Sequence, residues 1–227
     1  MRHILLIVSL VAFATGALAQ SPVLLKVDAR TGSKYVYRLD AKFVAEGANG
    51  SMGFSALMTD ALKSNKGKDQ VWSISFKVLS TYANGVMQGA DASFKELDGV
   101  SMESFSDSRG QIRKMRLAGV EVPNNGTPSI VFSPKPVKVG SKWPSSVDMN
   151  GKQVKVEYTL KSLKKEGGRK VAYIEGHYLP STIVRNVTPV RFWVDTKDGK
   201  MIRAEARILV TNQGQTVRLE YDIKRQG

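Results

Sequence analysis

The chain has 227 residues and no cysteine, and its 34 Lys and Arg residues against 20 Asp and Glu give a formal net charge of +14. The lack of cysteine excludes disulfides, and with only two histidines we expect no zinc or iron site of the usual His/Cys kind and no cofactor. The positive charge favours contact with anionic lipid, glycan or nucleic acid, although it can equally serve solubility alone.

The first 19 residues have the three-part pattern of a secretion signal. Arg2 and His3 form a positive head, residues 4–14 form an apolar run broken only by Ser9, and Ala17-Leu18-Ala19 supplies a small-x-small cleavage pattern. The apolar run of about 11 residues is shorter than the ~20 that a membrane span needs. We therefore expect cleavage after about Ala19 and a periplasmic or secreted protein without a transmembrane segment.

The rest of the chain alternates apolar and polar residues between recurring turn dipeptides. Asn-Gly, Asp-Gly and Gln-Gly pairs begin at residues 49, 84, 98, 125, 150, 198 and 213. Such pairs tolerate the positive φ of tight hairpins, and period-two alternation is typical of half-buried strands. The sequence predicts an all-β fold, an antiparallel meander of hairpins that forms an open barrel, a half-barrel or a sandwich.

The turn dipeptides also predict strand register in three hairpins. The turn at Gln213-Gly214 places apolar pairs on one face and a charged pair on the other: Ile208–Leu219, Ala206–Tyr221 and Arg207–Glu220. The turn at 150–151 pairs Trp143 with Tyr158. The turn at 49–50 pairs Tyr37 with Leu62 and Ala41 with Met58.

Three motifs recur in the same order in both halves of the chain. Residues 32–35 (Gly-Ser-Lys-Tyr) match 140–143 (Gly-Ser-Lys-Trp), 62–64 match 160–162, and 105–110 match 193–199. This order predicts two related β-units, residues 20–117 and 140–227, joined by a Pro-rich connector over residues 118–139. We expect residues 20–227 to form one compact domain.

The connector also carries a family resemblance. Pro134-Lys-Pro136-Val-Lys-Val139-Gly140-Ser-Lys-Trp143 resembles the mid-chain Pro-x-Pro-Val-x-Val-Gly-x-x-Trp motif of an uncharacterised family of bacterial exported proteins and lipoproteins, a domain of unknown function. The resemblance implies a bacterial envelope setting and no particular activity. Many members carry a lipobox cysteine, which this chain lacks.

No catalytic motif stands out. His177 is the one histidine after the leader, and a lone histidine at a strand end is more often structural than a general base. Asp107 and Asp195 precede turns, where an Asp accepts backbone hydrogen bonds more readily than it joins a catalytic pair. We expect a protein that is not an enzyme.

Asp60 is the carboxylate of most interest, because the alternation places it on the apolar face, between Met58 and Leu62 and opposite Leu39. A carboxylate there needs a charged partner or water. It either lines a ligand cavity or lies near the open end of the sheet, solvated or paired with Lys or Arg.

Basic residues of later strands and turns form a second candidate ligand site: Lys155, Lys161, Lys164, Lys165, Arg169, Lys170, Arg203 and Arg207. On neighbouring strands they would bind phosphate, sulfate or carboxylate groups of a polyanion. Four aromatics instead fall on apolar faces: Trp72, Trp143, Tyr158 and Tyr221. A nucleic-acid reader would expose such rings, so we expect no specific nucleic-acid recognition.

The leading hypothesis is an exported, non-enzymatic binding or carrier module of the bacterial envelope with an amphiphilic or anionic ligand. The apolar concave side of an open sheet can hold an amphiphile, with small residues such as Ala204 and Ala206 leaving room or marking close packing, and a basic rim would favour an anionic head. The alternative is a structural or assembly protein of the envelope that contacts proteins or polyanionic glycans. The oligomeric state stays open.

Overall fold

The computed structural model describes residues 21–47, 49–66, 69–84, 86–88, 98–122, 129–149, 151–212 and 214–227. The predicted leader, residues 1–19, lies outside the described residues, and so does the turn predicted at residues 125–126. In the described ranges, no helical segment has the length and hydropathy needed to cross a membrane.

The described secondary structure consists of strands, and every pair of neighbouring strands is antiparallel. The strands are β1 (Lys34–Ala45), β2 (Met52–Lys66), β3 (Asp69–Ala83), β4 (Val86–Gln88), β5 (Ser101–Ser106), β6 (Ile112–Leu117), β7 (Val120–Val122), β8 (Lys142–Met149), β9 (Lys152–Glu166), β10 (Arg169–Tyr178), β11 (Val184–Asp195), β12 (Met201–Asn212) and β13 (Gln215–Gln226). The predicted all-β class is confirmed.

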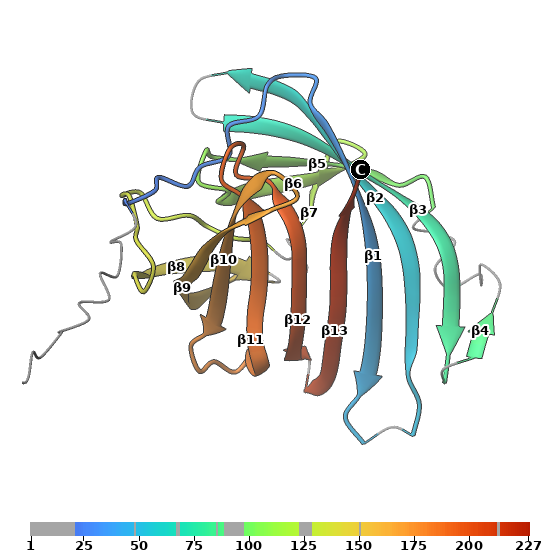
Figure 1. Cartoon of the computed structure of the whole chain (residues 1–227). Helices are drawn as coiled ribbons and strands as arrows, with labels where there is room; N and C mark the ends of the chain where they lie inside the picture. The colour runs from blue at the N-terminus through green and yellow to red at the C-terminus, as the bar shows by residue number, and fades with distance from the viewer. Residues whose placement is uncertain are drawn as a thin grey trace, which may run out of the picture.

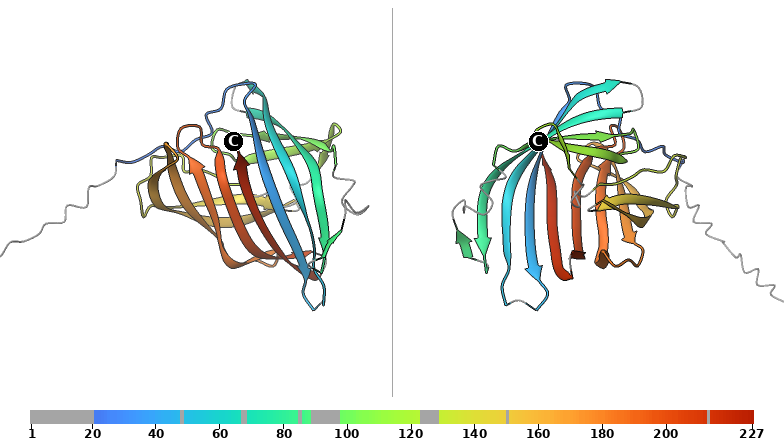
Figure 2. Two further views of the ribbon diagram at one scale, coloured as in Figure 1. Left: turned by 45° about the vertical axis from the view of Figure 1, so that its right-hand side comes forward. Right: turned by 180° about the vertical axis from the view of Figure 1, so that it is seen from behind.

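All thirteen strands belong to one open sheet, in the order β7-β6-β5-β3-β2-β1-β13-β12-β11-β10-β9-β8, with β4 beside β3. The sheet curls around a core (Figures 1 and 2). Gln111, just before β6, donates a side-chain hydrogen bond to the carbonyl of Ser146 on β8 at 3.2 Å, but no ladder joins β7 to β8 among the described residues. The unclosed sheet agrees with the predicted open barrel or half-barrel, and we refer to it below as the half-barrel.

The two halves of the chain meet at the ladder between β1 and β13, which runs from Val36–Gln226 to Ala45–Val217. The chain passes from the β7 edge to the β8 edge through the proline-rich segment. Its described part packs into the core: Val131 and Phe132 are each 1% exposed. The indole of Trp143 donates to the Val131 carbonyl at 2.8 Å. Residues 131–133 and 137 of this segment are thus buried inside the half-barrel, whereas Pro134 and Pro136 are exposed. The residue bounds predicted for the two units stay a prediction.

The motifs that recur in sequence make the same backbone hydrogen bonds. Gly32 N donates to Leu62 O at 2.9 Å, and Gly140 N donates to Leu160 O at 2.8 Å. Each leucine amide donates back to the serine that follows the glycine, at 2.9 and 3.0 Å. Read from β8 onward, the sheet holds the strands of the second predicted unit, then those of the first, and last β7, which lies in the predicted connector. These equal contacts support the predicted duplication.

Two of the three predicted registers are confirmed. At the last hairpin, Ile208 pairs with Leu219 and Ala206 with Tyr221. Trp143 pairs with Tyr158 in the β8–β9 ladder. The four aromatics expected on apolar faces are all buried: Trp72, Trp143, Tyr158 and Tyr221.

The register predicted around Asn49-Gly50 is wrong. Tyr37 pairs with Met58 rather than with Leu62, and Ala41 pairs with Phe54. The chain turns earlier than predicted, at Gly47, whose φ of 81° lies in the left-handed region. The slip covers an even number of residues, so every side chain keeps its predicted face.

Candidate ligand site on the inner face of the sheet

The inner face of the half-barrel is apolar. One buried cluster joins Tyr37 on β1, Phe192 on β11 and Ile223 on β13 to Leu25 and Phe132 of the two segments inside the curve. Ala204 and Ala206, on the same face, are buried and closely packed rather than exposed.

Five apolar side chains of this face are only partly buried: Leu39, Phe43, Phe76, Val210 and Leu219. In the right-hand view of Figure 2, β1 (blue), β2 (cyan) and β13 (red) extend further down than β5 and β6 (green). Apolar surface therefore stays partly accessible on the concave side.

Asp60 faces inward from β2, as the alternation predicted, but it pairs with Tyr35 in the ladder rather than with Leu39. Its Oδ2 accepts a hydrogen bond from Nζ of Lys200 at 3.2 Å, and the two side chains are only 15% and 13% exposed. The same ammonium lies 3.8 Å from the ring centroid of Trp72, where a cation–π contact offsets part of its desolvation. Asp60 thus has the basic partner that one of the two readings expected.

The turn between β11 and β12 positions Lys200. Asp198 Oδ1 accepts a hydrogen bond from the Lys200 amide at 2.9 Å, and Asp198 O accepts one from the Asp28 amide at 2.9 Å. Gly199 has a φ of 66°, and a Cβ there would overlap the carbonyl of Lys26. Only glycine lets the turn approach the N-terminal segment this closely.

A second ion pair lies beside the first. Asp198 Oδ2 accepts a hydrogen bond from the Tyr35 hydroxyl at 3.1 Å and lies 3.7 Å from Nη1 of Arg225. The guanidinium of Arg225 is 4.5 Å from the centroid of the Tyr35 ring. Partial burial, and then the charge of Asp198, raise the pKa of Tyr35. We call the following set the inner polar cluster: Tyr35, Tyr37, Asp60, Asp198, Lys200 and Arg225.

A cavity of about 120 Å³ adjoins this cluster, and Tyr37, Met58, Asp60 and Lys200 line it together with Ser104 and Ser129. The Tyr37 hydroxyl and Asp60 Oδ1 are buried, and neither has a hydrogen-bond partner among the described residues. Burial, and then the negative charge of Asp60, raise the pKa of Tyr37 well above its ordinary value. The wall of the cavity therefore contains one donor and one acceptor that have no partner among the described residues.

Sequence reasoning missed Lys200, Arg225 and Tyr37 as parts of this site. The sequence indicated the turn dipeptide before Lys200, but Lys200 and Asp60 are 140 residues apart in the chain. No local pattern indicates such a pair.

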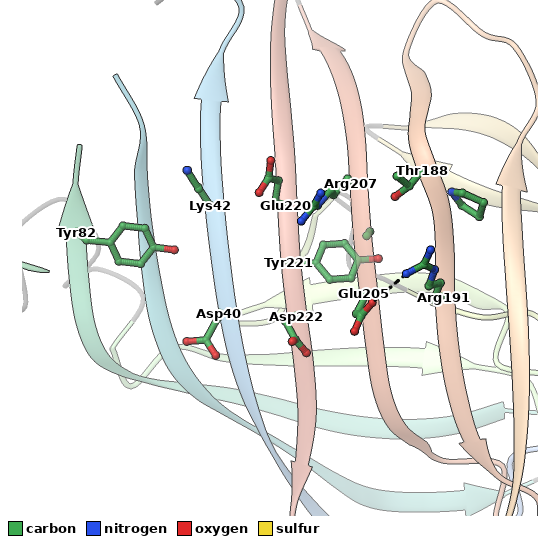
Figure 3. A pocket seen from close by; sticks show the side chains of 12 residues that line it. Asp40, Lys42, Tyr82, Thr188, Arg191, Glu205, Arg207, Glu220, Tyr221 and Asp222 are labelled. Atoms are coloured by element: carbon green, nitrogen blue, oxygen red, sulfur yellow. Dashed lines mark ion pairs between the residues drawn. The ribbon is translucent and has the colours of Figure 1, made fainter. Parts of the chain in front are cut away.

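The outer face carries a larger hollow of about 510 Å³ (Figure 3). Its charged lining comes from β1, β11, β12 and β13: Asp40, Lys42, Arg191, Glu205, Arg207, Glu220 and Asp222. All four carboxylates form ion pairs with neighbours, such as Glu205 with Arg191 at 3.6 Å and Asp40 with Arg38 at 3.1 Å. Charges of both signs alternate here, so the hollow does not favour a polyanion.

The predicted basic site divides into two groups. Six residues are exposed on β9 and β10: Lys155, Lys161, Lys164, Lys165, Arg169 and Lys170. Lys161 pairs with Glu175 at 3.3 Å. Arg203 and Arg207 lie on β12, which β11 separates from β10. Arg203 pairs with Glu205 and with Asp222 and stacks on Trp193, so its charge is already engaged. Polyanion binding by this set stays a prediction.

No protein-family model matches the chain, and no curated protein matches it. Among solved structures, it is similar to one of lipid–protein interactions in lipovitellin, at 8% identity and a TM-score of 0.51, over 87% of this chain and 25% of that one. The chain thus spans about a quarter of the length of that protein. This likeness shows a shared fold.

Two further solved structures match over similar lengths. One is a putative outer membrane lipoprotein-sorting protein domain from Vibrio parahaemolyticus, at 12% identity and a TM-score of 0.31, covering 88% of this chain and 87% of that one. The other is a DUF1329 family protein from Desulfovibrio piger, at 12% identity and a TM-score of 0.28, covering 86% of each chain.

Proposed function

We propose that the chain is an exported, non-enzymatic carrier that holds the apolar part of an amphiphile against the inner face of its half-barrel. The observation that carries this proposal is the row of partly buried apolar side chains inside an unclosed sheet, among them Leu39, Phe76 and Leu219. Partly exposed apolar surface on a concave face favours ligand burial, because removing it from water is favourable.

Two sequence features support the export part of the proposal. The first 19 residues have the order of a secretion signal, and the proline-rich segment resembles that of bacterial exported proteins. The fold shared with the lipovitellin structure, which concerns lipid–protein interactions, agrees with a lipid as the ligand.

The test uses residues 20–227, native mass spectrometry of gently purified protein, and an apolar fluorescent probe that a lysophospholipid displaces. Val210 and Leu209 are neighbours on β12 with similar burial and opposite faces, and so provide a matched pair. We expect Val210→Gln to weaken probe binding by about tenfold and Leu209→Gln to leave it unchanged. Absence of both a co-purified amphiphile and probe binding, or equal effects of the two variants, would reject the carrier function.

One observation favours the alternative role in envelope assembly. The strand ends on either side of the turn between β9 and β10 expose Lys164, Lys165, Arg169 and Lys170 without an ion pair among the described residues. Capture of a polyanionic glycan that falls steeply with salt would support this role, because counterion release makes such contacts salt-dependent.

A further inference from the structure

We propose that the 120 Å³ cavity beside the inner polar cluster is the head-group site of the carried amphiphile, and that it selects a neutral, hydroxyl-bearing head. The inference rests on the proposed carrier function and adds the chemical class of the ligand. It differs from the anionic head that a basic rim would favour.

The wall of the cavity contains polar groups whose hydrogen bonds are not satisfied by the described part of the chain. Tyr37 is 1% exposed and its hydroxyl has no partner among the described residues, and the buried Oδ1 of Asp60 has none either. Buried polar groups normally find a partner, so an unmatched pair at one cavity indicates a missing polar group. A hydroxyl meets both needs, since it can donate to the carboxylate and accept from the phenol.

The charged side chains of the inner polar cluster already balance one another. Lys200 already pairs with Asp60 at 3.2 Å, and Arg225 pairs with Asp198 at 3.7 Å, so two cations balance two carboxylates. An anionic head would meet the free oxygen of Asp60 with no spare cation. A cationic head would lie close to the ammonium of Lys200. In a site of low dielectric, either charge would remain uncompensated, which favours a neutral head.

The size and position of the cavity suit a small head group attached to an apolar chain. A water molecule takes up about 30 Å³ of the liquid, so the cavity has the volume of about four water molecules, which suits a small polyol head such as glycerol. Tyr37 lines the cavity, and Leu39, two residues further along the same face of β1, is partly exposed. That step is about 7 Å along a strand. A chain attached to the head would pass directly onto the apolar surface.

The test compares three ligands with the same twelve-carbon chain, a glycerol monoester, a carboxylate and an amine, each displacing the apolar probe from residues 20–227 below its micelle concentration. We expect the glycerol ester to bind about tenfold more tightly than either charged ligand, the value of a well-made buried hydrogen bond. Tyr37→Phe removes only the hydroxyl and should reduce this preference to within about threefold while probe binding persists.

Tyr82→Phe is the matched control, because its hydroxyl donates to the Ala41 carbonyl at 2.8 Å and the residue lines the outer hollow. This variant should keep the full preference. Equal binding of the three ligands, or an unchanged preference in Tyr37→Phe, would show that the cavity holds only water and would overturn the inference while leaving the carrier function intact. If the unmodified protein did not bind the probe at all, both the inference and the proposed carrier function would be overturned.

Discussion

Nζ of Lys200 donates a hydrogen bond to Oδ2 of Asp60 at 3.2 Å, across 140 residues of sequence and within a largely buried environment. The pair connects the turn between β11 and β12 to β2. With the Tyr35–Asp198 hydrogen bond, which spans 163 residues, it joins the two halves of the chain beside the β1–β13 ladder.

Removing one partner of this pair should destabilise the fold. We expect Lys200→Met to lower the free energy of unfolding by roughly 3 kcal/mol, because it leaves the Asp60 carboxylate buried without its cation. The double variant Asp60→Leu/Lys200→Met should recover most of the loss. Urea unfolding measures both.

The control for that prediction is Lys142→Met, which breaks an exposed pair with Glu157 at 3.0 Å and should cost less than about 1 kcal/mol. A Lys200→Met protein as stable as the Lys142→Met protein would show that the inner pair contributes nothing.

Gly199 should tolerate alanine poorly. Its φ of 66° and the overlap of a Cβ with the Lys26 carbonyl add strain, so we expect Gly199→Ala to cost about 3 kcal/mol. Gly214 has a φ of 80° but no atom near its Cβ position, so Gly214→Ala should cost only about 1 kcal/mol. Thermal unfolding of the two variants compares them, and equal losses would contradict the close contact.

Tyr173 should titrate late. Burial, and then its hydrogen bond to Glu175 at 2.7 Å, raise its pKa to about 12 from an ordinary 10.0. Because the pKa of Tyr173 is higher in the folded than in the unfolded protein, its contribution to stability is complete below pH 10 and disappears as the pH rises through about 12.

The measurement for Tyr173 is the ¹³C shift of labelled tyrosine ring carbons between pH 9 and 12.5. Glu175→Gln should move the pKa of Tyr173 toward 10, since it removes the carboxylate that accepts the bond. Glu157→Gln serves as the control, and a midpoint near 10 in the unmodified protein would contradict the assignment.

The exposed basic residues at the ends of β9 and β10 should contribute to surface attachment and not to binding of the carried ligand. We expect charge reversal of Lys164, Lys165, Arg169 and Lys170 to Glu to reduce binding to anionic vesicles by more than tenfold at low salt, while probe binding stays unchanged. Sedimentation with vesicles at two salt concentrations measures the first effect. A loss of probe binding would instead connect these residues to the inner site.

Side-chain direction was predictable from the sequence, and strand partners were predictable only where the turn was short. The Gln213-Gly214 turn fixed Ile208 opposite Leu219, because a tight turn leaves one register. The longer loop after β1 turns at Gly47 instead of at Asn49-Gly50, and the predicted pairing of Tyr37 was wrong although its face was right.

The amino-acid sequence alone determined the all-β class, the inward direction of Asp60 and the buried aromatics, because alternation with period two is a local property of an extended chain. Tertiary structure alone decided that Lys200 meets Asp60, that Val131 and Phe132 pack into the core and that the sheet stays open. Those outcomes depend on which distant strands become neighbours, and the ladder of β1 with β13 brings together residues that nothing in the local pattern relates.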